Sequence, residues 1–135
     1  MRNRNSGFTL IELLLVMVIL VVLAAVVVLR FTGRSEQARQ TAATTDIAAI
    51  ESALDAFEVD NGRYPSNDEG LGALLVAPSG LQNWRGPYLK RNAVPVDPWK
   101  NNYVYNFPST RGHDYDLLSM GPDQREGTSD DVGNW

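Results

Sequence analysis

The C-terminal segment from Asp114 to Trp135 is rich in carboxylates. It holds one basic residue, Arg125, against six acidic ones, namely Asp114, Asp116, Asp123, Glu126, Asp130 and Asp131. The stretch that begins at Gly121 lacks the spacing of an EF-hand, but it gathers the hard oxygen donors that Ca²⁺ binds. Such a run is also typical of a solvated face or a loose tail. The residues alone therefore leave two interpretations, a calcium site or a solvated acidic segment.

A second group of carboxylates, Glu51, Asp55 and Glu58, has helical spacing and resembles a paired-carboxylate site. The opposite side of the same helix is apolar, so these side chains are expected on its solvent-exposed face. His113 is the only histidine, and the chain has no cysteine, which excludes disulfides, thiolate metal sites and cysteine nucleophiles. We therefore expect no catalytic residue and no enzyme.

Glu12 is a carboxylate inside an apolar run. The stretch from Phe8 to Leu29 is apolar except for Thr9 and Glu12. As a helix it would be roughly 33 Å long, enough to cross the hydrocarbon core of a bilayer, and it exceeds the apolar region of a cleaved secretory signal peptide. Arg2 and Arg4 precede it and favour a cytoplasmic N-terminus. A carboxylate within a membrane costs about 2–3 kcal/mol, so Glu12 either reaches the head groups or has a partner.

The remainder of the chain is polar and acidic. The whole chain has 12 basic and 16 acidic side chains and a net charge of −4, and its lysines and arginines form no cluster. Because nucleic-acid binding draws most of its affinity from basic side chains, nucleic acid is excluded as a partner.

A long helix must carry both Glu12 and the acidic face. No proline interrupts residues 8–60, and Asn61-Gly62 is a helix stop signal. The second half has an apolar stripe with spacings of four and three residues, formed by Ala43, Ile47, Ile50, Leu54 and Phe57. The pattern predicts one continuous helix whose second half packs against the rest of the chain.

Short elements come after the helix. Ser66 and Glu69 have the spacing of a capping box, which predicts a short helix through about Val76. Residues 102–107 and 115–120 are rich in aromatic and aliphatic side chains and are predicted to be antiparallel strands. The expected fold class is therefore α+β, a long N-terminal helix packed against a small antiparallel sheet with a loop-rich C-terminal region.

The string Gly7-Phe8-Thr9-Leu10-Ile11-Glu12, followed directly by the apolar run, resembles the processing signature of type IV prepilins and type II secretion pseudopilins. The resemblance implies that prepilin peptidase cuts after Gly7 and methylates the new N-terminal Phe8. Glu12 would then be one helical turn from the new amine, and an ion pair with the amine of a neighbouring subunit would make it an assembly residue. This divides the chain into a leader (1–7), a transmembrane and filament-core helix (8–30) and a periplasmic head (31–135).

The resemblance extends over essentially the whole chain, and it is to the major pseudopilins of type II secretion systems, which have a type IV pilin-like fold. It rests, in order, on Glu51-Ser52-Ala53-Leu54-Asp55, Asp60-Asn61-Gly62-Arg63-Tyr64-Pro65, Glu69-Gly70-Leu71, Asp97-Pro98-Trp99, Ser119-Met120-Gly121-Pro122-Asp123 and Asp131-Val132-Gly133-Asn134-Trp135. It implies Ca²⁺ as a cofactor. The implied ligands are the side chains of Asp123, Thr128 and Asp131, with Asp130 as the alternative carboxylate, and the carbonyls of Met120 and Val132.

The resemblance also implies a function. The chain is expected to polymerise with itself into a periplasmic pseudopilus that helps drive folded exoproteins across the outer membrane. Its expected partners are minor pseudopilins, prepilin peptidase, the inner-membrane assembly platform with its ATPase, and the secretin channel. It is expected to sit in the inner membrane as a single-pass protein with its head in the periplasm. Two other functions stay open at this point: an adhesive or DNA-uptake type IV pilin, and a membrane-anchored calcium-binding protein.

Overall fold

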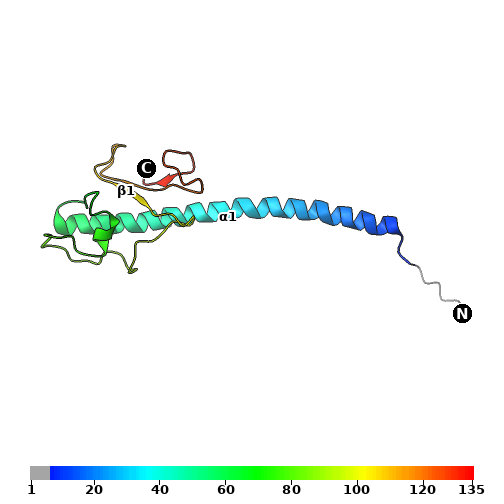
Figure 1. The fold of residues 1–135 in the computed structure, drawn as a ribbon, viewed down its shortest axis with the longest axis horizontal. Coiled ribbons are helices and arrows are strands. Elements are labelled where there is room, and N and C mark those ends of the chain that lie inside the picture. The colour runs from blue at the N-terminus through cyan, green and yellow to red at the C-terminus, as the bar shows by residue number, and fades with distance from the viewer. Residues whose placement is uncertain (1–6) are drawn as a thin grey trace. The chain divides into compact units, whose positions relative to one another are not determined.

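A computed structural model describes residues 7–135, except for the side chains of residues 27–33. The described elements are α1 (Leu10–Asn61), the 3₁₀ helix η1 (Leu71–Leu74), β1 (Val104–Asn106), β2 (Asp116–Ser119) and β3 (Val132–Gly133) (Figure 1). The first six residues of the expected leader lie outside the described residues, as do the last side chains of the expected membrane segment. The chain forms two compact units, and the division falls after Gln37.

The first unit contains the N-terminal part of α1. Every large apolar side chain from Phe8 to Val26 is exposed, with exposed fractions between 49% and 80%. Among the residues whose placement is described, no helix combines the length and the apolar character needed to cross a membrane.

The second unit, Ala38–Trp135, is organised around the C-terminal part of α1. All five residues of the predicted apolar stripe are buried, so the predicted amphipathic helix is confirmed. The helix ends where the stop signal predicts, because Gly62 has a φ of 73° and its N–H donates a 2.7 Å hydrogen bond to the Glu58 carbonyl.

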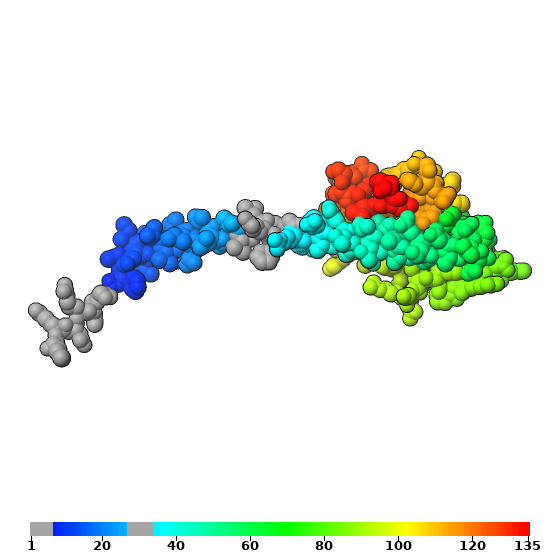
Figure 2. All heavy atoms as spheres, turned by 180° about the vertical axis from the view of Figure 1, so that it is seen from behind, coloured from blue at the N-terminus to red at the C-terminus, as the bar shows by residue number. Residues whose placement is uncertain are grey.

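The strands form one antiparallel sheet in the order β1-β2-β3. Tyr105 on β1 pairs with Leu117 on β2, and Leu118 on β2 pairs with Gly133 on β3. The central strand β2 is buried throughout. Within this unit, the yellow-green segment after α1 runs along one side of the helix and the orange and red C-terminal third along another (Figure 2). Both predicted strands are therefore confirmed, with shorter bounds, and the predicted α+β class is confirmed.

The predicted short helix after Pro65 is wrong in type. The capping box itself forms, because the Ser66 N–H donates a 2.8 Å hydrogen bond to Glu69 Oε2 and the Glu69 N–H lies 3.4 Å from Ser66 Oγ. An α-helix does not continue from it, since Gly70 has a φ of 54° and breaks the helical path. The chain forms the single 3₁₀ turn η1 in its place.

Candidate functional site

The bond expected to be cut lies in an accessible stretch of backbone. Gly7 and Phe8 precede α1 without regular secondary structure, and Phe8 is 80% exposed. A Cβ added at Gly7 would meet no atom within 4 Å. The Gly7–Phe8 peptide is therefore open to an enzyme from several directions, which suits a processing site.

Thr9 and Glu12 lie at the N-terminal end of α1 and contact each other. The backbone N–H and the hydroxyl of Thr9 each lie 3.4 Å from Glu12 Oε2, while the Glu12 N–H donates to the Thr9 hydroxyl at 3.3 Å. This reciprocal arrangement is a capping box, and it also places the carboxylate at the positive end of the helix dipole. The Thr-x-x-Glu spacing in the sequence carried this signal, but Glu12 was predicted to reach the head groups or to act in assembly, not to cap the helix.

The acidic loop between β2 and β3 brings together three of the side chains expected to bind calcium, those of Asp123, Thr128 and Asp130. The Thr128 hydroxyl donates a 2.6 Å hydrogen bond to Asp130 Oδ1 and lies 3.4 Å from Asp123 Oδ1. The Asp123 N–H donates to Asp130 Oδ2 at 3.3 Å, and the Gly127 N–H donates to Asp131 Oδ2 at 2.7 Å. The hydrogen bond from Thr128 lowers the pKa of Asp130 below its usual value.

The loop owes its closed path to three left-handed residues, Gly121, Gln124 and Gly127, with φ values of 63°, 58° and 89°. At Gly121 the approach is so close that an added Cβ would lie 2.5 Å from the Asp130 carbonyl oxygen. Glycine at this position therefore lets the two ends of the loop meet.

Asp131 is the part of the loop that best fits a cation. Its Oδ1 atom is buried and has no hydrogen-bond partner, whereas buried polar atoms are normally paired. A bound cation would satisfy this oxygen. No group of three or more acidic, histidine or cysteine side chains suited to a metal occurs among the described residues. Beyond Asp131 and a second carboxylate, a cation here would therefore depend on neutral oxygens, which the Thr128 hydroxyl and the carbonyls of Met120 and Val132 could supply.

The second carboxylate group lies on the surface of the head. Asp55 is exposed, and its Oδ1 lies 3.4 Å from the Tyr64 hydroxyl. Glu51 and Asp55 line a polar hollow of about 730 Å³ together with His113 and Asp114. The position on the solvent side of α1 agrees with the expectation from the sequence.

Known families match nearly the whole chain. Residues 30–135 match the family described as "Type II secretion system (T2SS), protein G", and residues 2–28 match the "Prokaryotic N-terminal methylation motif". The second match contains the Gly7-Phe8 string and Glu12.

Similar proteins carry one name. The "Type II secretion system core protein G" of Pseudomonas aeruginosa is 49% identical over 141 residues, which cover 99% of this chain and 97% of the relative. The protein of that name from Escherichia coli K12 is 44% identical over 138 residues, covering 98% of this chain and 92% of the relative. Among solved structures, the major pseudopilin of the type 2 secretion system of enterohaemorrhagic E. coli matches with a TM-score of 0.67 and 37% identity, covering 77% of this chain and 92% of that one.

Proposed function

Because the chain belongs to the type II secretion system protein G family and is a subunit of the pseudopilus, we propose that it is a non-enzymatic building block whose polymerisation helps drive folded exoproteins across the outer membrane. The observation that carries the proposal is the exposed apolar surface of α1 from Phe8 to Val26. Covering a single leucine, valine or isoleucine side chain is worth about 1.5–3 kcal/mol, so this surface needs an apolar environment. A membrane supplies it before assembly, and the helices of neighbouring copies supply it in the filament.

The proposed topology is based on the residues on either side of this surface. Arg2 and Arg4 hold the N-terminus in the cytoplasm, and the acidic head lies in the periplasm. In this position the leader meets prepilin peptidase, and the helix meets the inner-membrane platform that an ATPase drives. The head meets minor pseudopilins and the secretin channel as the filament grows.

Processing creates the charge that assembly uses. Prepilin peptidase cuts after Gly7 and methylates Phe8, which leaves an amine in the apolar filament core. Glu12 of a neighbouring copy neutralises this amine, because neither charge is tolerated alone in an apolar environment. In the unprocessed chain the Glu12 carboxylate has Thr9 as its partner, so the ion pair in the filament replaces an existing local hydrogen bond.

Calcium is proposed to stabilise the head. The ligands are the side chains of Asp123, Thr128 and Asp131, with Asp130 as the alternative carboxylate, and the Met120 and Val132 carbonyls. The unpaired Asp131 Oδ1 supports this assignment. A head of about 75 residues beyond the helix, without cysteines, is of a size that often requires a metal or a disulfide.

The proposed function is tested in a bacterium that produces the secretion system and lacks its own copy of this subunit. The wild-type chain is expected to restore both sheared filaments and secretion of a folded exoprotein into the medium. A Gly7→Leu variant is expected to restore neither. Secretion that is restored by an uncleaved, monomeric chain would contradict the proposal.

A further inference from the structure

Asp97 is a buried carboxylate with no assigned role. It is 2% exposed and lies in a tight turn of residues 97–101. Its Oδ1 accepts hydrogen bonds from the Trp99 N–H at 3.0 Å and the Asn101 N–H at 2.7 Å. Its Oδ2 accepts a 2.5 Å hydrogen bond from the hydroxyl of Ser119, the last residue of β2. Asp97 therefore connects this turn to the strand from which the acidic loop departs.

Ser119 also contacts the start of the acidic loop. It is fully buried, and its Oγ accepts a 3.2 Å hydrogen bond from the Gly121 N–H. The Asn101 side chain donates to the Gly121 carbonyl at 3.3 Å. The Gly121 N–H is thus held by Ser119, which Asp97 contacts, and the Gly121 carbonyl is held by Asn101 of the turn that Asp97 organises.

The Gly121 N–H and the Met120 carbonyl belong to one peptide group. A trans peptide is planar, so its C=O and N–H point in opposite directions. Because the N–H points toward Ser119 Oγ, the Met120 carbonyl points away from Ser119 and Asp97. This carbonyl is one of the proposed calcium ligands, and its direction is set by a hydrogen bond to a residue that does not itself touch the ion.

We propose that Asp97 is a positioning residue for the calcium site, acting through Ser119 on the Met120–Gly121 peptide. This inference rests on the calcium site proposed above. A chain of hydrogen bonds that ends in a carboxylate polarises each member, so the Asp97–Ser119–Gly121 chain also makes the Met120 carbonyl oxygen a more negative ligand. Groups that orient metal ligands typically contribute about 10- to 100-fold to metal affinity.

Asp116 provides a matched control. It is also 2% exposed and accepts a 2.5 Å hydrogen bond from a serine hydroxyl, that of Ser109. It holds the segment around Thr110 through two further 3.0 Å hydrogen bonds, and it lies at the other end of β2 from Ser119. Loss of Asp116 therefore tests the effect of losing a buried carboxylate that is not connected to the acidic loop.

The experiment titrates the detergent-solubilised full chain with CaCl₂ by isothermal calorimetry, after treatment with chelator, and measures its melting temperature in chelator. Ser119→Ala and Asp97→Asn are expected to weaken Ca²⁺ binding by about 10- to 100-fold. Asp116→Asn is expected to lower the melting temperature in chelator while it keeps the wild-type Kd. Ser119→Ala removes one hydroxyl and leaves Asp97 its two backbone donors, so it tests the inference even if Asp97→Asn does not fold.

The outcomes separate the two proposals. Weaker binding in Ser119→Ala with an unchanged Kd in Asp116→Asn supports the positioning role. A wild-type Kd in Ser119→Ala, with or without a lower melting temperature, overturns it while the calcium site stands. A wild-type chain that shows no heat of Ca²⁺ binding overturns the calcium site and the positioning role together.

Discussion

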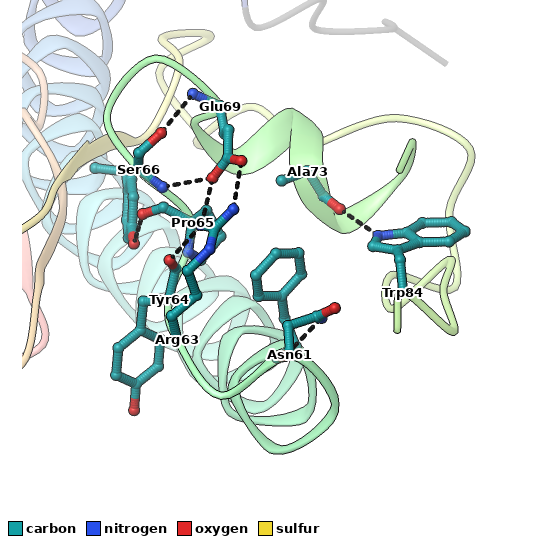
Figure 3. A network of polar contacts seen from close by, with 10 residues as sticks. Asn61, Arg63, Tyr64, Pro65, Ser66, Glu69, Ala73 and Trp84 are labelled. Atoms are coloured by element: carbon teal, nitrogen blue, oxygen red, sulfur yellow. Dashed lines mark hydrogen bonds and ion pairs between the residues drawn. The ribbon is translucent and has the colours of Figure 1, made fainter. Parts of the chain in front are cut away.

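Glu69 stabilises the head through an ion pair with Arg63, and the pH dependence of the melting temperature measures its contribution. Figure 3 shows its carboxylate facing Arg63, with two 2.6 Å hydrogen bonds between the guanidinium and the two carboxylate oxygens. The Ser66 N–H donates a third hydrogen bond to the same carboxylate. The hydrogen bond from Arg63 is the main cause that lowers the pKa of Glu69 from 4.5 to about 2.

The lowered pKa of Glu69 sets an upper limit on the free energy that its ion pair with Arg63 contributes to folding. A decrease from 4.5 to about 2 corresponds to at most about 3.4 kcal/mol, at 1.36 kcal/mol per pKa unit. The Arg63 side chain is 41% exposed, so solvent screening reduces the contribution to about 1–2 kcal/mol. In the unit Ala38–Trp135, Glu69→Gln should therefore lower the melting temperature by roughly 5–15 °C at neutral pH.

The sign of the pH dependence is fixed by the lowered pKa. The folded state holds Glu69 ionised more strongly than the unfolded state, so the stabilisation is complete above pH 4.5 and is lost as the pH falls toward 2. The gap in melting temperature between wild type and Glu69→Gln should therefore close over this window. Thermal unfolding followed by tryptophan fluorescence at a series of pH values measures it.

A matched control is the neighbouring carboxylate. Asp68 is exposed, so Asp68→Asn makes the same change in charge one residue away and should change stability by less than about 0.5 kcal/mol. If Glu69→Gln and Asp68→Asn melt together at pH 7, or if the Glu69→Gln gap is as wide at pH 2 as at pH 7, the ion pair does not contribute as argued.

Three further predictions concern processing, assembly and calcium. Gly7→Leu should leave an uncleaved precursor that does not assemble, which immunoblotting detects as a larger band; a mature-size band would contradict it. Glu12→Ala should stay in the membrane fraction, since it removes a costly carboxylate, but should lose sheared filaments because the Phe8 amine lacks a counter-charge; an unchanged filament yield would contradict the ion pair. Millimolar Ca²⁺ should raise the melting temperature of the head by roughly 10 °C or more over chelator, as expected for a hundredfold excess over Kd. Asp123→Ala should abolish most of this difference, and Glu126→Ala should not. Equal melting temperatures with and without Ca²⁺ would contradict the calcium site and favour the interpretation of the loop as a solvated acidic segment.

The sequence predicted those elements whose signal is local. The apolar stripe of α1 and the stop at Asn61-Gly62 depend on spacing within a few turns, and both are confirmed. β3 was not predicted, because two residues carry no periodic pattern. It is held instead by tertiary hydrogen bonds, since the Asn134 side chain accepts from the Leu117 N–H and donates to the Tyr115 carbonyl.

In the candidate site, contacts between residues close in the sequence were also predictable, and contacts between distant residues were not. The closeness of Thr128 to Asp123 and Asp130 is a consequence of their spacing in one short loop, and the structure brings them together. The role of Asp97 depends on Ser119, 22 residues later, and no local pattern relates the two. The cap formed by Thr9 shows a third case, a local signal that was present but was assigned to a different function.

The proposed function requires that this chain is a processed subunit of a filament. An intact-mass measurement of the chain recovered from sheared filaments tests this requirement, because one spectrum reports both cleavage and methylation. We predict the mass of residues 8–135 with one added methyl group. Filaments whose subunit has the mass of the full chain from Met1 would contradict the proposed processing.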